Sequence, residues 1–312
     1  MQPHGDSALV LFPGALGDLL CFLPTLVALR ARHRGRMLLV ANPAALGLLR
    51  LADLATVSID RQELAQLFVA EPVVSAAARE LLGGFERVYS WMGFGNAEIR
   101  RHLGAITGGR VDVHRFRGMQ SREHAVDYYA RCAGVQPQAC LADFIADDPD
   151  WFASLQRRDE WERGIAVFHS GSGSPRKNWR GFPAVIQRWQ ESARGPAVLL
   201  RGPAEVEGGP ESGVGPDVVV DALTLPQVAT LLRRARLYVG NDSGISHLAA
   251  AVGAFGVVLF GPTDPTIWAP RGRHLEILHA PDPCPRCGPE LFCVHRLPVR
   301  RVFEAMEGCM QS

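Results

Sequence analysis

The sequence predicts an α/β protein of two doubly wound domains, each built on a parallel sheet. Short apolar runs alternate along the chain with segments of helical period, which is typical of β-α-β units. The alternation lapses over residues 134–163, where charged residues, Pro and Asp accumulate, and it then resumes. A chain of 312 residues, 47% of them hydrophobic, can form two cores of about 150 residues each. We therefore expect domains at residues 1–150 and 151–312.

The expected elements of the first domain come in strand and helix pairs. Apolar runs of strand length lie at 8–13, 37–43 and 87–92, and helical segments follow at 19–32, 44–50 and 97–104.

The second domain repeats this order. Apolar runs lie at 164–171, 197–203, 217–222, 237–242 and 256–262, and helical segments lie at 182–192, 225–236 and 244–253. Thr224 is an expected N-cap, because Pro226 follows in the first turn, where its missing N–H costs nothing. Ligands are expected at the carboxyl ends of the strands in such folds.

Charge and cysteine content narrow the function. A formal net charge of +1 argues against a general nucleic-acid binder, which needs a basic excess to neutralise phosphates. Residues 1–18 lack the pattern of a secretion signal, and no apolar run approaches about 18 residues. Seven cysteines do not form an evenly paired framework. We expect a cytoplasmic protein with mostly reduced thiols and no transmembrane segment.

Residues 239–253, VGNDSGISHLAAAVG, place polar residues where an expected strand passes into an expected helix. The free N–H groups of a helix N-terminus attract phosphate, and Gly244 and Ser243 would let an anion approach and receive a hydrogen bond. Asp242 suits sugar hydroxyls, and His247 lies in the first helical turn. The alternative is that Asp242 or Ser243 only caps the helix and His247 packs in the core.

The loop HSGSGSPRKNWRGFP follows another expected strand and carries Ser170, Ser172 and Lys177. Small hydroxyl residues and glycines supply donors without bulk, and a lysine ammonium suits a diphosphate. The alternative for Lys177 is a solvated loop. The spacing matches neither a dinucleotide fingerprint nor a P-loop.

Two carboxylates also follow expected strands. Glu205, after AVLLRGPA, either accepts both ribose hydroxyls of a nucleotide or is a surface glutamate. In PGALGDLL, Gly14 and Gly17 bracket a tight turn before Asp18. Asp18 is either the N-cap of the following helix or a general base.

These segments together resemble glycosyltransferase family 9, the bacterial ADP-heptose:lipopolysaccharide heptosyltransferases and their relatives. The resemblance runs from PGALGDLLCFLPTLVALR, through HSGSGSPRKNWRGFP and LRGPAEVE, to the stretch from LTLPQVATLL to GPTDPTIWAP. It implies the GT-B fold, in which two Rossmann-like domains face each other across a cleft. The N-terminal domain would bind the acceptor and the C-terminal domain the nucleotide sugar.

The resemblance also implies roles for the residues that match the family's motifs. Asp18 would be the catalytic base, with Gly17 beside it at the acceptor, and Lys177 would contact the donor diphosphate. The other donor-binding positions would be Ser170, Ser172, Glu205, Asp242, Ser243, Gly244 and His247. The turn reads Asp-Ser-Gly where Asp-Thr-Gly is usual, and Asn178 separates the lysine from Trp179, so the resemblance leaves the donor and the acceptor open.

A mechanism follows from the implied geometry. Asp18 would take the proton of an acceptor hydroxyl as it attacks the anomeric carbon, with inversion, while Lys177 and the helix near Gly244 stabilise the departing diphosphate. A metal such as Mg²⁺ would then be optional and no other cofactor required. The donor would be ADP-heptose or a similar nucleotide sugar.

Arginines and cysteines give two further expectations. Arg115, Arg117 and Arg122 would bind an anionic lipopolysaccharide-type acceptor at the inner face of the cytoplasmic membrane. The basic run Arg30, Arg32, Arg34 and Arg36 is expected to be a solvated helix end. A tail with Cys284, Cys287, Cys293 and His295 is expected to be structural, with a zinc site as the alternative.

The sequence thus predicts an inverting glycosyltransferase that moves heptose, or a similar sugar, to a lipopolysaccharide core-type acceptor. One alternative is a GT-B nucleotide-sugar epimerase, which would convert the free donor without an acceptor. Another is a non-catalytic nucleotide-sugar-binding protein. The oligomeric state is left open.

Overall fold

A computed structural model describes residues 6–68, 74–120, 122–155, 159, 161, 164–203, 215–285 and 292–311. The chain divides into two compact units, Met1–Phe144 and Ile145–Ser312. The division lies within the segment 134–163, where the alternation of strands and helices lapses. Glu205 and Cys287 lie outside the described residues.

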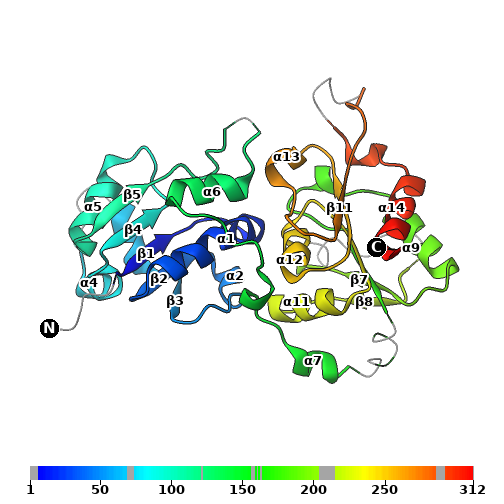
Figure 1. The fold of residues 1–312 in the computed structure, drawn as a ribbon, viewed down its shortest axis with the longest axis horizontal. Helices are drawn as coiled ribbons and strands as arrows, with labels where there is room; N and C mark the ends of the chain where they lie inside the picture. Colours follow the sequence, from blue (N-terminus) through cyan, green and yellow to red (C-terminus); the bar gives the residue numbers. More distant parts are fainter. Residues whose placement is uncertain are drawn as a thin grey trace. The chain divides into compact units, whose positions relative to one another are not determined.

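The first unit contains a five-stranded parallel sheet in the order β3-β2-β1-β4-β5 (Figure 1). The chain adds β2 and β3 on one side of β1 and then crosses to the other side for β4 and β5. The point where the direction reverses, between β1 and β4, is where such sheets bind ligands. The strands are β1 (Ala8–Leu11), β2 (Met37–Ala41), β3 (Leu54–Ser58), β4 (Arg87–Ser90) and β5 (Arg110–Val113).

Helices connect these strands. All four residues of β1 are buried, and helix α1 buries most of its residues although Pro24 lies inside it. Apolar side chains of β1, β2 and β4 form a core with those of α4 and α5. The helices are α1 (Leu16–Arg32), α2 (Pro43–Leu46), α3 (Gln62–Ala65), α4 (Ala76–Leu82), α5 (Ala97–Thr107) and α6 (Ala125–Ala133), with 3-10 turns η1 (Gln66–Phe68) and η2 (Ala142–Phe144).

The second unit contains a six-stranded parallel sheet in the order β11-β10-β9-β6-β7-β8. Here the direction reverses between β6 and β9, as in a Rossmann fold. The strands are β6 (Ala166–His169), β7 (Ala197–Leu200), β8 (Val218–Val220), β9 (Leu237–Asn241), β10 (Gly256–Phe260) and β11 (Leu275–His279).

The helices of this unit bear out the expected pairing of strand and helix. Thr224 caps α11 in a full capping box with Gln227, and a proline lies in the first turn, which confirms the expected cap. The helices are α7 (Pro149–Ala153), α9 (Phe182–Glu191), α11 (Leu225–Arg234), α12 (Gly244–Val252), α13 (Pro265–Trp268) and α14 (Val299–Gln311), with 3-10 turns η3 (Pro175–Lys177) and η4 (Val294–Arg296).

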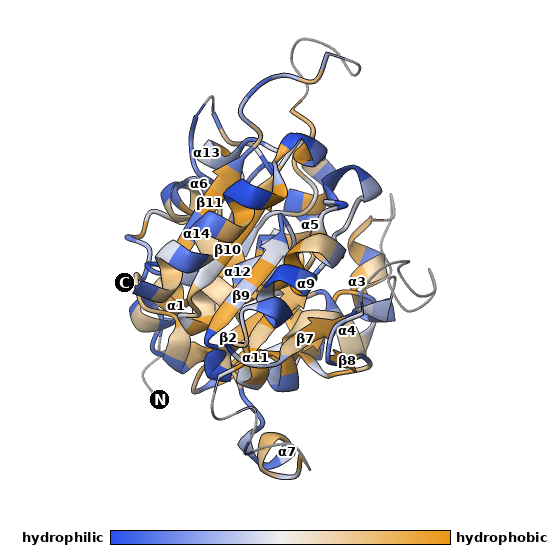
Figure 2. Cartoon of the chain, turned by 90° about the vertical axis from the view of Figure 1, so that its right-hand side faces the viewer, coloured by the Kyte–Doolittle hydropathy of each residue, from blue (hydrophilic) through white to orange (hydrophobic). Residues whose placement is uncertain are grey.

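Buried apolar side chains hold the second unit together. Strand β10 is mostly orange in Figure 2, whereas α9 and α14 show both orange and blue, as expected of helices with one buried face. Phe168 from β6 packs in one cluster with Trp189 from α9 and Phe303 from α14. The predicted α/β class with two doubly wound, Rossmann-like units is confirmed. Within the described parts of the chain, no helix combines the length and apolarity needed to cross a membrane.

Candidate functional site

In the second unit, two polar loops leave the sheet at its switch point. Strand β6 pairs with β9 so that His169 lies opposite Gly240, and the two strands therefore end at the same edge. Asn241, fully buried, follows directly. Its Nδ2 donates to the Ser170 carbonyl at 2.6 Å, and its Oδ1 accepts from the Trp179 backbone N–H at 3.2 Å. Asn241 thus fixes both ends of the loop after β6 against β9.

No role for Asn241 was predicted from the sequence. The available signal was an amide at the end of a buried apolar strand, because a buried amide requires hydrogen-bond partners.

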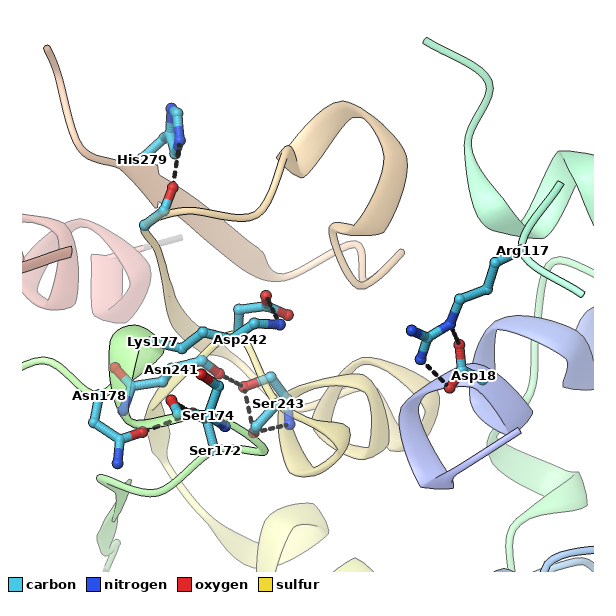
Figure 3. A network of polar contacts seen from close by, with 12 residues as sticks. Asp18, Arg117, Ser172, Ser174, Lys177, Asn178, Asn241, Asp242, Ser243 and His279 are labelled. Atoms are coloured by element: carbon cyan, nitrogen blue, oxygen red, sulfur yellow. Dashed lines mark hydrogen bonds and ion pairs between the residues drawn. The ribbon is translucent and has the colours of Figure 1, made fainter. Parts of the chain in front are cut away.

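Lys177 and Asp242 form an ion pair between these two loops (Figure 3). Lys177 Nζ lies 2.6 Å from Asp242 Oδ2, and the side chains are 28% and 6% exposed. From the sequence, Lys177 was expected to contact the donor diphosphate and Asp242 the sugar hydroxyls. The contact between the two side chains was not predicted. A nearly buried carboxylate needs a cation or hydrogen bonds, and Lys177 supplies both.

The turn after β9 begins helix α12. Ser243 is its N-cap, and the hydroxyl accepts from the Ser246 backbone N–H at 3.4 Å. The same hydroxyl lies 3.4 Å from His169 Nδ1. Gly244 is the first helical residue and His247, 8% exposed, lies in the first turn. Ser243 therefore caps α12, as the alternative to an anion-binding role for Ser243 predicted. Helix α12 also begins at Gly244, so the helix N-terminus expected there is present.

The loop after β6 is organised by its own side chains. Ser170 is buried. Ser172 Oγ lies 2.7 Å from the Ser174 carbonyl and 2.6 Å from Asn178 Oδ1, and it accepts from the Ser174 backbone N–H at 3.2 Å. The hydroxyl of Ser172 therefore shapes the loop that carries Lys177.

Two further polar side chains lie after β10 and at the end of β11. Asp264, after β10, caps α13 through a 2.8 Å bond from the Thr266 N–H. His279, at the end of β11, lies with Nε2 3.0 Å from the Gly261 carbonyl (Figure 3). Among the residues that the structure describes, no group of three or more His, Cys, Asp and Glu is placed to hold a metal ion.

In the first unit, the site is built at the exit of β1. Asp18 lies in the first turn of α1 and is 5% exposed. The N-cap of α1 is Ala15, so the alternative that Asp18 caps this helix is wrong. Arg117 instead binds both oxygens of Asp18: Nε lies 2.9 Å from Oδ1 and Nη2 lies 2.8 Å from Oδ2 (Figure 3). The hydrogen bond from Arg117 to Asp18 raises the pKa of the guanidinium.

Close packing around Asp18 explains one of the two glycines before it. A Cβ on Gly14 would lie 2.5 Å from the Asp18 Cβ and 2.5 Å from Phe12 Cε1, so only glycine fits there. Gly17 is half-buried in the first turn of α1. Tyr129 from α6 is fully buried near Asp18, and burial, together with the charge of Asp18, raises its pKa.

The two basic clusters differ in what they contact. In the loop after β5, Arg117 binds Asp18, Arg115 lies over the Phe94 ring at 5.2 Å, and Arg122 is exposed. At the end of α1 and just beyond it, three of the four arginines donate to backbone carbonyls: Arg30 to Gly35 and Asp53, Arg32 to Ala133 and Gly134, and Arg36 to Leu81 and Gly83. The expected solvated helix end therefore also anchors neighbouring segments, although Arg32, Arg34 and Arg36 are exposed.

Comparison with known proteins gives a consistent family. A model of glycosyltransferase family 9 (heptosyltransferase) matches residues 117–290. A curated relative, lipopolysaccharide heptosyltransferase 1 of Pseudomonas aeruginosa, is 37% identical over 76 residues, which are 24% of this chain and 21% of that protein. The chain thus spans about a fifth of the length of the curated relatives it matches.

Solved structures are similar over nearly the whole chain. A family 9 glycosyl transferase from Veillonella parvula covers 100% of this chain and 98% of its own, with a TM-score of 0.73 and 18% identity. The Escherichia coli heptosyltransferase WaaC with ADP covers 97% of this chain and 99% of its own, with a TM-score of 0.66 and 20% identity. These likenesses bear out the GT-B fold class.

Proposed function

We propose that the chain, which belongs to glycosyltransferase family 9, the heptosyltransferases, is a glycosyltransferase that transfers heptose or a similar sugar from an ADP-sugar. The acceptor is a lipopolysaccharide core-type saccharide, and the anomeric configuration inverts. The observation that carries this proposal is the family match over residues 117–290, which includes both polar loops of the second sheet. A structural neighbour described with ADP and a curated lipopolysaccharide heptosyltransferase support the donor and acceptor classes.

The second unit supplies the donor site in this proposal. Lys177 turns from Asp242 toward the diphosphate when the donor binds, and the N-terminus of α12 at Gly244 faces the same charge. Asp242 then accepts hydrogen bonds from sugar hydroxyls. Ser170, Ser172, Ser243 and His247 line this donor site, and Glu205 holds the ribose.

The first unit supplies the base and the acceptor site. Asp18 takes the proton of the acceptor hydroxyl while that oxygen bonds to the anomeric carbon, and the bond from this carbon to the diphosphate breaks. The nucleoside diphosphate leaves with the electron pair, and Lys177 stabilises the charge. Gly17, Arg115, Arg117 and Arg122 contact the acceptor. A glycolipid acceptor would place the reaction at the inner face of the cytoplasmic membrane, and Mg²⁺ would be optional.

Replacement of Asp18 by Asn tests this function. We expect the turnover of an ADP-sugar with a core oligosaccharide acceptor to fall by about 10²–10⁴-fold, because no side chain then accepts the proton. The affinity for ADP, measured by calorimetry, should stay within about twofold, because the donor loops belong to the second unit. Asp53→Asn is the matched control, since Asp53 is an exposed aspartate of the same unit.

Three outcomes separate the proposal from other functions. Unchanged turnover in Asp18→Asn removes Asp18 as the base. Conversion of the free nucleotide sugar without any acceptor indicates an epimerase. Tight ADP-sugar binding with no turnover under any condition indicates a binding protein.

A further inference from the structure

We propose that Arg117 is a positioning residue that holds Asp18 in the resting enzyme and releases it to an acceptor that carries an oxyanion group. The phosphate or carboxylate of such an acceptor binds the Arg117 guanidinium and thereby replaces Asp18 as its hydrogen-bond partner. This inference rests on the proposed role of Asp18 as the base. It narrows the acceptor class to alcohols with an anionic group close to the attacking hydroxyl.

The contact between Arg117 and Asp18 occupies both carboxylate oxygens. The two bonds, at 2.9 and 2.8 Å, are parallel and charge-assisted, which is the strongest geometry for this pair of side chains. A proton that arrives from an alcohol must therefore compete with the guanidinium for Asp18. As long as the pair persists, Asp18 is held in place, and each of its oxygens already accepts a charge-assisted hydrogen bond from the guanidinium.

Burial differs sharply between the two partners. The Asp18 side chain is 5% exposed, whereas that of Arg117 is 55% exposed. A ligand in solution therefore reaches the guanidinium before it reaches the carboxylate. Phosphate and carboxylate groups both match the planar fork of arginine, so either of them competes directly with Asp18.

The segment that carries Arg117 is suited to an anionic ligand. Arg115 lies two residues earlier in the loop after β5, and its guanidinium stands over the ring of Phe94, which is 53% exposed. Arg117 itself lies over the Phe116 ring at 5.3 Å and has a φ of 54°, in the left-handed region that non-glycine residues rarely adopt. Such a conformation persists only where surrounding contacts hold it, and functional sites are where it is most often found.

Two groups among the described residues interact electrostatically with the Asp18–Arg117 pair, and neither is cationic. They are Tyr129 on α6 and Cys21, which follows Asp18 by one turn on α1. Once Arg117 turns to the acceptor, an Asp18 oxygen can accept the hydroxyl proton. That proton passes from the acceptor oxygen to Asp18 as the oxygen bonds to the sugar, and the diphosphate departs with the bonding electrons.

This arrangement couples the base to the correct acceptor. Water carries no anionic group, so the approach of water to the anomeric carbon does not by itself draw Arg117 away from Asp18.

The proposal can be tested by letting a free anion compete with Asp18 for Arg117. This test needs neither the nucleotide-sugar donor nor the sugar-transfer reaction. Sulfate is titrated at constant ionic strength against chloride, and the ¹⁵Nε–H resonance of Arg117 is followed by NMR in the full chain. Removal of the competing carboxylate in Asp18→Asn should tighten sulfate binding about tenfold or more. Asp18→Ser, which removes the same carboxylate, is the second variant should the first not fold.

Controls make each result decisive. Arg117→Gln identifies the resonance and should abolish the tight sulfate binding, whereas Arg110→Gln removes an exposed arginine of the same unit and should leave it in place. Equal sulfate affinity in the wild type and in the Asp18 variants would overturn the proposal. So would tight binding that survives in a protein with both Asp18→Asn and Arg117→Gln. Neither result depends on whether the protein transfers heptose.

Discussion

The ion pair between Lys177 and Asp242 should be a measurable source of stability in the second unit. Breaking it by Lys177→Met leaves a carboxylate that is 6% exposed without its cation. The double variant, Lys177→Met with Asp242→Asn, no longer contains this unpaired carboxylate. A double-mutant cycle over the two changes isolates the energy of the pair.

Geometry and burial set the magnitude of this coupling. The bond of 2.6 Å joins two charged groups, and hydrogen bonds to charged groups contribute about 1.5–3 kcal/mol. Lys177 retains 28% exposure, so water can partly replace it, and we expect a coupling energy of about 2 kcal/mol. That energy corresponds to about a 30-fold change in the unfolding equilibrium.

Urea unfolding followed by tryptophan fluorescence is a suitable assay. Trp91 is the sole tryptophan of residues 1–144, and the other five lie in the second unit, so the emission reports mainly on that unit. A coupling energy below about 0.5 kcal/mol, in the range of an exposed surface pair, would refute the argument from burial.

Three further changes test other parts of the molecule. Gly14→Ala should lower turnover by about 100-fold, because the new Cβ displaces Asp18; Gly47→Ala, where a Cβ meets nothing within 4 Å, should leave turnover unchanged. Asn241→Ala should lower the free energy of unfolding by about 2 kcal/mol or more and weaken ADP binding, since the loop after β6 loses both anchors; normal ADP affinity would contradict this. Burial lowers the pKa of His114, so below the unfolded value of 6.5 the unfolded chain binds a proton that the folded chain does not. The free energy of unfolding should therefore fall as the pH drops through about 6.5, and the slope should be smaller in His114→Gln; equal slopes would argue against this role for His114.

The order of strands and helices was accessible from sequence because it depends on local patterns. Apolar runs of four or five residues bounded by Gly, Pro or Asp correspond to β1, β6, β9 and β10, and the cap at Thr224 follows from residues within one turn. Such signals need no knowledge of distant segments. The position of polar residues at strand ends was predictable for the same reason.

Which polar residues contact each other was decided only by the tertiary structure. Asp18 and Arg117 are 99 positions apart, and Lys177 and Asp242 are 65 positions apart. The sequence suggested a helix cap, a base, a solvated loop or ligand contacts for these residues and paired none of them with another, because charged residues near strand ends give no sign of their partners. The crossover of each sheet brings those strand ends together, and burial of a carboxylate there makes a nearby cation necessary. Local propensity thus determined the elements, whereas the pairing of charges depended on sheet topology and on the cost of burying an ion.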